Sequence, residues 1–219
     1  NNAGIMTGPD EAMHKSVDGI EATFATNVVG PAALTLSLLE TLRASSSPGA
    51  PSRVVNIGSR SIMGFSGMGG PAQFDFDNID GSKSFHGVEA YKNSKLAFAW
   101  LTYELARRSK DKSVTVNIVC PGFVPETAGE HAKGFQKFLF QHVLTHVPGA
   151  HSAAEASDNL VWAVTDPALA DVTGKFFGER KPWDSGSDAQ DTAKAKKLWE
   201  TVCALAKIDD ATVAKLGLA

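Results

Sequence analysis

The stretch Arg53-Val54-Val55-Asn56-Ile57-Gly58-Ser59 decides the fold, because it is a short apolar, partly β-branched run that stops at a glycine and a serine. Such a run is typical of a buried strand. Apolar side chains at helical spacing predict a helix before it, over 16–44, and another after it, over 89–108. The run Val114–Val119 predicts the next strand. Strands that alternate with helices indicate parallel strands, crossover helices and an α/β layered fold.

The rest of the chain extends this pattern. Gly30-Pro31 should bend the first helix, since proline removes a helical N–H group. The Gly- and Ser-rich segment 58–87 is too long for a plain turn, which favours an active-site loop. With no strand before it, Arg53–Ile57 could be an unprotected sheet edge. Further helices are expected over 135–147, 153–165 and 187–207, and a last strand over Gly174–Phe177.

Composition narrows the class of protein. The 219 residues are 43% hydrophobic, enough for one domain with a buried core over 1–219. A net charge of −3 with interspersed signs makes nucleic acid an unlikely partner. Two cysteines are too few for a disulfide framework, and neither a long apolar run nor a signal peptide pattern is evident. We therefore expect no membrane segment in this chain and a cytoplasmic location.

Tyr91 and Lys95 lie four residues apart on the helix predicted over 89–108, so both side chains point to the same side of it. An ammonium group near a phenol favours the phenolate and brings a poor base closer to its working range. Ser59, at the end of a strand, can donate to a substrate oxygen beside the tyrosine. Asn27 could hold a water behind the lysine. Taken alone, however, a Tyr and Lys at this spacing is more often a solvated surface pair.

A metal site is not expected. His142 and His146 are four apart, but no carboxylate or cysteine at ligand spacing completes a zinc site. Solvated or partner-facing histidines are the simpler interpretation.

The motifs together resemble the short-chain dehydrogenase/reductase family, especially its retinol dehydrogenase and WW-domain oxidoreductase branch. Five stretches match family motifs in the family's order: Asn1-Asn2-Ala3-Gly4, Asn27-Val28-Val29-Gly30, Val55-Asn56-Ile57-Gly58-Ser59, Tyr91-Lys92-Asn93-Ser94-Lys95 and Pro121-Gly122-Phe123-Val124. The resemblance covers about residues 1–180. It implies a Rossmann-like doubly wound parallel sheet with helices on both faces, of which this chain supplies the later strands.

The resemblance also implies roles. Tyr91 would be the general acid/base, Lys95 would lower its pKa and bind the nicotinamide ribose, Ser59 would orient the carbonyl, and Asn27 would keep a relay water. The implied cofactor-binding residues are Asn2, Ala3, Gly4, Tyr91, Lys95, Pro121, Gly122, Val124 and Thr127. Thr127 departs from the family pattern, because Glu126 stands where the threonine usually is, so its pyrophosphate contact is in doubt.

A larger departure precedes the chain. The family's glycine-rich pyrophosphate loop and its first strands, on the order of 80 to 90 residues, are absent, and the chain begins at Asn1 rather than at a methionine. Gly64–Gly70 does not replace that loop, because its spacing does not fit. We interpret it as a substrate-side loop. The residues that choose between NAD(H) and NADP(H) are missing too, and we lean toward NADP(H).

The sequence thus predicts an NAD(P)-dependent oxidoreductase that transfers a hydride between nicotinamide and the carbonyl or alcohol of a small, apolar or aromatic substrate. A non-enzymatic scaffold or fragment that lacks its cofactor half is the alternative. A homodimer, or association with the missing N-terminal part, also stays open.

Overall fold

A four-stranded sheet forms the centre of the computed structural model, which describes residues 1–8, 11–64, 68–128, 138–147 and 149–219. The strand order is β1-β2-β3-β4. The first three strands run parallel, and the last pairs antiparallel with β3; their bounds are β1 Ser52–Ile57, β2 Val114–Cys120, β3 Phe176–Gly178 and β4 Lys181–Pro182. The predicted α/β class is confirmed.

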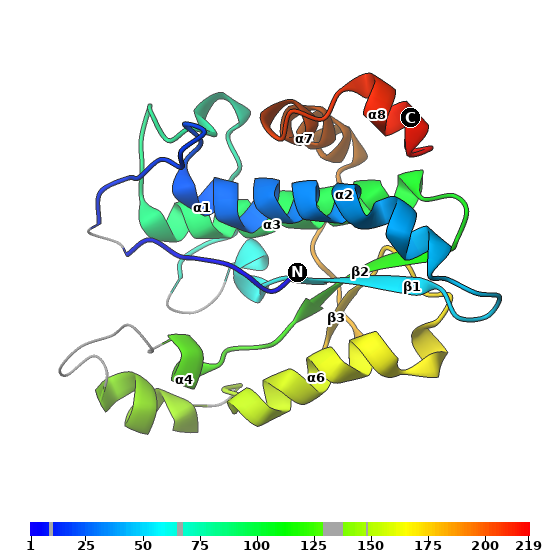
Figure 1. Ribbon diagram of the computed structural model, residues 1–219. Coiled ribbons are helices and arrows are strands. Elements are labelled where there is room, and N and C mark those ends of the chain that lie inside the picture. The colour runs from blue at the N-terminus through cyan, green and yellow to red at the C-terminus, as the bar shows by residue number, and fades with distance from the viewer. Residues whose placement is uncertain (9–10, 65–67, 129–137, 148) are drawn as a thin grey trace.

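Helices cover both faces of the sheet, as predicted (Figure 1). One face carries α1 Ala22–Phe24, a π turn Ala25–Val29, α2 Gly30–Ala44, α3 Gly87–Arg108, α7 Thr192–Leu205 and α8 Asp210–Lys215. The other carries α4 Pro125–Ala128 and α6 Ala153–Thr165. Helix α3 crosses over between β1 and β2, which is why those two strands are parallel.

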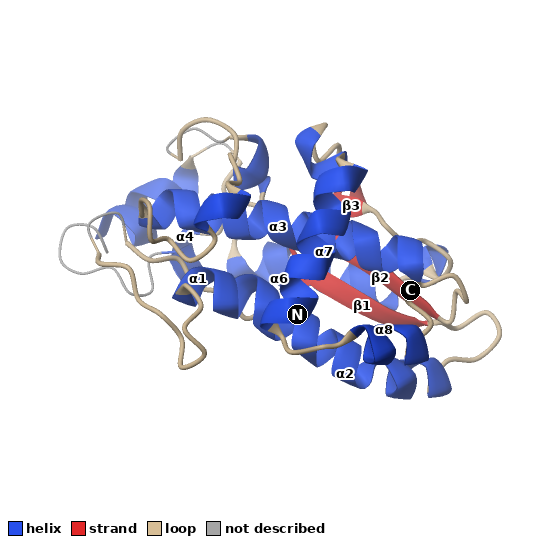
Figure 2. Cartoon of the chain, turned by 90° about the horizontal axis from the view of Figure 1, so that it is seen from above, coloured by secondary structure: helices blue, strands red, loops and turns tan. Residues whose placement is uncertain are grey.

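The larger core lies between the sheet, α2, α3 and α7. Trp100 of α3 is fully buried, and its indole donates a hydrogen bond to the Asp188 carbonyl over 2.7 Å. Helix α7 packs along α3 through Leu198 and Trp199, as the view from above shows (Figure 2). This packing fixes the axis of α3, the helix that carries Tyr91 and Lys95.

The expected homodimer stays a prediction.

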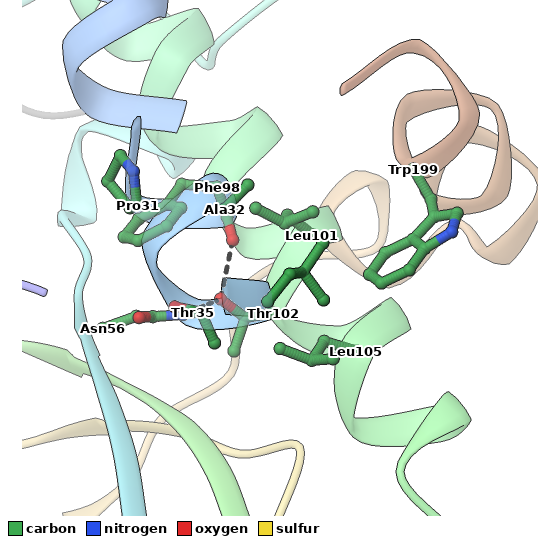
Figure 3. Close-up of a pocket in the computed structure, with 10 residues that line it drawn as sticks. Pro31, Ala32, Thr35, Asn56, Phe98, Leu101, Thr102, Leu105 and Trp199 are labelled. Atoms are coloured by element: carbon green, nitrogen blue, oxygen red, sulfur yellow. Dashed lines mark hydrogen bonds between the residues drawn. The ribbon is translucent and has the colours of Figure 1, made fainter. Parts of the chain in front are cut away.

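A small void remains inside this core. It has a volume of about 10 Å³ and lies between α2, α3, α7 and β1, with Asn56, Thr102 and Trp199 among its lining residues (Figure 3). That is room for about one water. The Asn56 amide donates to the Thr102 hydroxyl, which donates to the Phe98 carbonyl. The polar groups are satisfied, so we treat the void as a packing feature.

The first helix is interrupted by a π turn just before Pro31. It runs from Ala22 to Ala44, and in the π turn the Gly30 N–H donates to the Ala25 carbonyl. Pro31 falls at the start of α2, where its missing N–H is tolerated. The predicted bend at Gly30-Pro31 stays a prediction.

Three labelled elements, α4, β4 and α8, were not predicted, and one prediction lies partly outside the described residues. Strand β4 follows a turn at Glu179-Arg180, and the short helix α8 is capped by the Asp209 carboxylate. Of the helix expected over 135–147, residues 135–137 are not described, and 139–146 form a π turn and a 3-10 turn. The strand expected over Gly174–Phe177 starts two residues later than predicted.

The helix Ala22–Ala44 meets the length and composition of a membrane span, with a mean hydropathy of 1.4. A little over half of its apolar window, 56%, is buried inside the protein. The apolar core helix of a folded domain has the same character. The expected absence of a membrane segment therefore stays a prediction.

Candidate functional site

The candidate site lies at the carboxyl ends of β1 and β2, where the first residues of the chain pass (Figure 1). The amino group of Asn1 donates to the Val55 carbonyl over 2.9 Å, and the Ile57 N–H donates to the Asn1 carbonyl over 3.1 Å. Asn1 thus pairs with the end of β1, which was expected to be an unprotected edge. The residues that follow Asn1 run toward α3 and the π turn.

Asn27 connects this N-terminal segment to α3. Its amide group donates to the Ile5 carbonyl and to the Ser94 hydroxyl, each over 2.9 Å, and its carbonyl oxygen accepts from the Ile5 N–H over 2.8 Å. Ser94 in turn donates to the Tyr91 carbonyl over 2.7 Å. Asn27 is 1% exposed and sits in the π turn, a feature often found at functional sites. Its side chain thus ties together the N-terminal segment, the π turn and α3, and the relay water expected at Asn27 stays a prediction.

Lys95 extends from α3 toward the end of β1. Its ammonium group donates to the Ile57 carbonyl over 2.9 Å and lies 5.7 Å from the centre of the Tyr91 ring. The side chain is 6% exposed, and its burial lowers the pKa of Lys95 to about 8. One acceptor satisfies only one of the three ammonium protons. The remaining donors are available to a bound group.

Tyr91 and Ser59 meet at the same place, from different elements. Ser59 follows β1 and caps a 3-10 turn, Arg60–Met63. Burial raises the pKa of Tyr91, and the hydrogen bond with the Ser59 side chain only partly opposes that rise. A lysine on the same side of the helix was expected to lower this pKa. The direction is the reverse here, because desolvation of the buried phenol is the largest influence on its pKa.

The Pro121-Gly122 turn closes the other side of the site, after β2. Gly122 has a φ of +87°, and a Cβ there would be 2.3 Å from the His151 ring, so only glycine fits. Cys120, just before the turn, is 2% exposed. Burial raises the pKa of its thiol, although hydrogen bonds from the backbone of Gly122 and Arg60 oppose the rise. The Cys120 thiol thus connects this turn to the residue after Ser59.

Comparisons with known proteins show what the whole chain is similar to. A family model described as enoyl-(acyl carrier protein) reductase matches residues 76–177. Human retinol dehydrogenase 14 is 32% identical over 91% of this chain and 55% of its own length. Human polyprenol dehydrogenase is 30% identical over 97% of this chain and 62% of its own length. The chain is therefore similar to dehydrogenases and reductases of the short-chain dehydrogenase/reductase kind over most of its length. It spans a little over half the length of the curated relatives it matches.

Solved structures support the fold of this family. A protein from Mycobacterium paratuberculosis has a TM-score of 0.66 at 22% identity, covering 94% of this chain and 65% of its own. The NADP complex of RhlG from Pseudomonas aeruginosa has a TM-score of 0.54 at 25% identity, covering 85% of this chain and 64% of its own. The predicted Rossmann-like class is confirmed. The expected cytoplasmic location has no support from these relatives and stays a prediction.

The residues present fit the nicotinamide and ribose end of a short-chain dehydrogenase cofactor. A Cβ on Gly4 would lie 3.4 Å from the Asn27 side-chain oxygen and 3.6 Å from the Lys95 nitrogen. Glycine therefore leaves that side of the ammonium group accessible. Asn2 and Ala3 are exposed beside it, as a contact with a ligand requires. Pro121 is partly buried, and Val124, 8% exposed, follows the turn.

Thr127 is the weakest of the expected cofactor contacts. It lies in α4, it is exposed, and its hydroxyl donates to the Val124 carbonyl over 3.1 Å. Its contact with a cofactor stays a prediction. The described residues contain no group of three or more His, Cys, Asp or Glu side chains that could hold a metal ion; His131 lies outside them.

Two site residues carry more than sequence reasoning assigned to them. Ser94 joins Asn27 to the Tyr91 helix turn, and Cys120 joins two turns of the backbone. A signal for Ser94 exists in the sequence, because a serine three residues after Tyr91 can reach back to its carbonyl. Cys120 has no such signal.

Proposed function

We propose that this chain carries the catalytic residues of an NAD(P)-dependent oxidoreductase that interconverts a carbonyl and an alcohol. The observation that carries the proposal is the buried Lys95 ammonium group, which donates to the Ile57 carbonyl at the end of β1 and lies 5.7 Å from the centre of the Tyr91 ring, with Ser59 two residues after Ile57. Three groups able to donate to one substrate oxygen, or to its proton donor, converge there from two elements. A cofactor bound at this site would supply or accept the hydride.

In the direction of reduction, the raised pKa keeps Tyr91 protonated, as a general acid must be. The Ser59 hydroxyl orients the carbonyl oxygen while Tyr91 gives it a proton. In the direction of oxidation, Tyr91 must first lose that proton, which burial opposes. A bound cation or a full set of donors has to offset this cost, and Lys95 is the cation nearest to the Tyr91 ring.

The cofactor proposed is NADP(H), with NAD(H) as the alternative. Lys95 would hold the ribose with its remaining donors, and Asn2, Ala3 and Gly4 would lie along it. Pro121, Gly122 and Val124 would present backbone groups to the carboxamide. The support for NADP(H) is the RhlG complex, at 25% identity.

The substrate proposed is a small-molecule alcohol or carbonyl compound with an apolar or aromatic body. The support is the two relatives named for apolar alcohols, retinol and polyprenol. The substrate-side segment 62–70 and the segment 128–147 that would cover the substrate are apolar in part, but both include residues outside those described.

Titration of NADPH and NADH fluorescence with this 219-residue chain tests the proposal first. Saturable binding, followed by oxidation of the bound cofactor when an apolar aldehyde is added, is the expected result. Absence of both binding and turnover, in a chain whose circular dichroism shows it folded, would overturn the proposal for this chain and leave a non-enzymatic scaffold or a fragment that lacks its cofactor half.

A further inference from the structure

The segment that follows the catalytic serine is folded back on itself at two points. The Ala72 N–H donates to the Ile62 carbonyl over 3.1 Å, which brings the ends of the segment 62–72 together. Inside this pair, Gly64 has a φ of +84°, and a Cβ there would lie 3.0 Å from the backbone of Gly70 and Pro71. These two contacts between its ends fix where the segment starts and ends. Residues 65–67 lie outside those described.

Lys92 of α3 reaches this segment from the helix. Its ammonium group donates to the Met68 carbonyl over 3.2 Å and to the Glu89 carboxylate over 2.8 Å. The Lys92 side chain is 1% exposed, whereas Glu89 is 47% exposed. Enclosing a lysine this completely is costly unless it is paired and hydrogen-bonded. The two partners together meet that requirement.

The region after the segment is held to α3 in a different way. The Phe74 ring lies 4.9 Å from Phe76 and 5.4 Å from Trp100, centre to centre, and Phe76 stacks on Trp100 at 5.9 Å. These apolar contacts do not depend on Lys92. A change at Lys92 should therefore loosen the segment around Met68 and leave the aromatic cluster in place.

We propose that Lys92 is a positioning residue that holds residues 68–72, whose Ala72 pairs with Ile62, against α3 and so sets the substrate side of the site. Lys92 is the neighbour of Tyr91, and the segment begins three residues after Ser59. The two ends of the segment are therefore fixed relative to the Tyr91 and Ser59 hydroxyls. The proposal rests on the proposed function for its effect on substrate, but not for the hold on the segment itself.

The test is hydrogen exchange and steady-state kinetics of Lys92→Met beside the wild-type protein. Loss of a hydrogen bond to a charged group weakens an interaction by about tenfold or more. We expect amides of segment 62–72 to exchange about tenfold faster, with no change at Phe74–Phe76. We also expect a similar rise in the substrate KM, with an unchanged KM for NADPH and a smaller change in kcat.

Glu89→Gln is the matched control, because it breaks the same ion pair but leaves the bond to Met68. It should lower overall stability, because the buried Lys92 loses its carboxylate partner, but it should leave exchange in the segment, relative to the rest of the chain, and the substrate KM near wild type. Equal effects of the two variants, or wild-type exchange in Lys92→Met, would overturn the proposal. If Lys92→Met does not fold, Lys92→Gln, one bond too short, takes its place with the same expected direction, and wild-type behaviour in it counts against the proposal. An inactive wild-type protein with loosened exchange in Lys92→Met would contradict the proposed function alone.

Discussion

Helix α3 buries two lysines three residues apart, and their surroundings treat the charge differently. Lys92 is 1% exposed, with the Glu89 carboxylate 2.8 Å away and a loop carbonyl as second acceptor. Lys95 is 6% exposed and donates to the Ile57 carbonyl, and no carboxylate in the part of the chain that the structure describes pairs with it. Burial lowers the pKa of Lys95 to about 8.

This difference suggests a structural role for Lys92 and a functional role for Lys95. A buried cation with a carboxylate partner holds structure together, and removal of either partner is costly. A buried cation without one destabilises the fold, which proteins tolerate mainly where the charge has a task. Only the surroundings of Lys95 also include Tyr91, Ser59 and Asn27. The proposed chemistry is therefore assigned to the surroundings of Lys95, although the two lysines are only three residues apart.

The largest effect expected from a change near Lys95 is that of Tyr91→Phe. Loss of the phenol removes the proton donor, so kcat should fall by about 100-fold to 10,000-fold, with little change in NADPH affinity. Tyr103→Phe is the matched control, because Tyr103 is the other tyrosine of the chain and also hydrogen-bonds a serine, Ser185, over 2.8 Å. It should cost stability but not turnover. Undiminished turnover in Tyr91→Phe, measured by nicotinamide absorbance, would refute the mechanism.

The next effect concerns stability and pH. Since the pKa of Lys95 falls from 10.5 to about 8 on folding, the unfolded chain binds more protons than the folded one between these values. Stability from this group therefore rises with pH across that window. Lys95→Met should be more stable than the wild type at pH 7 by on the order of 3 kcal/mol, and the difference should shrink toward pH 10. Urea unfolding at several pH values measures it, and a difference independent of pH would contradict the assignment.

The sequence predicts the side of α3 that carries chemistry better than it predicts the charge state there. The spacing of Tyr91 and Lys95 places both on one side of the helix, as found. The pKa direction of Tyr91 was wrong, because it depends on burial, which is set by segments far away in the sequence.

The fold shows the same limit. Runs of β-branched residues and helical spacing predicted β1, β2 and α3 to within two residues. The short strand β4 was missed, because its turn places Glu179 and Arg180 at positive φ without a glycine or asparagine to announce it. The π turn at Asn27 was missed because Pro31 reads as a helix breaker unless its place at the start of α2 is known. Local sequence patterns predict helices and strands, but the turns that connect them depend on tertiary packing.

The smallest effect expected is that of Ser94→Ala, and its matched control lies on the same helix. Ser94 and Thr102 are both buried hydroxyls that donate to a carbonyl of their own helix and accept from an asparagine side chain, Asn27 or Asn56. Ser94→Ala and Thr102→Val should each cost about 1 kcal/mol of stability. Only Ser94→Ala should lower kcat, by a few-fold, and shift its pH profile, because only Asn27 connects to the surroundings of Lys95. Equal kcat in the two variants would show that the hydrogen bonds of Asn27 only stabilise the fold. The groups near Lys95 that affect turnover would then be limited to Tyr91, Ser59 and Lys95 itself.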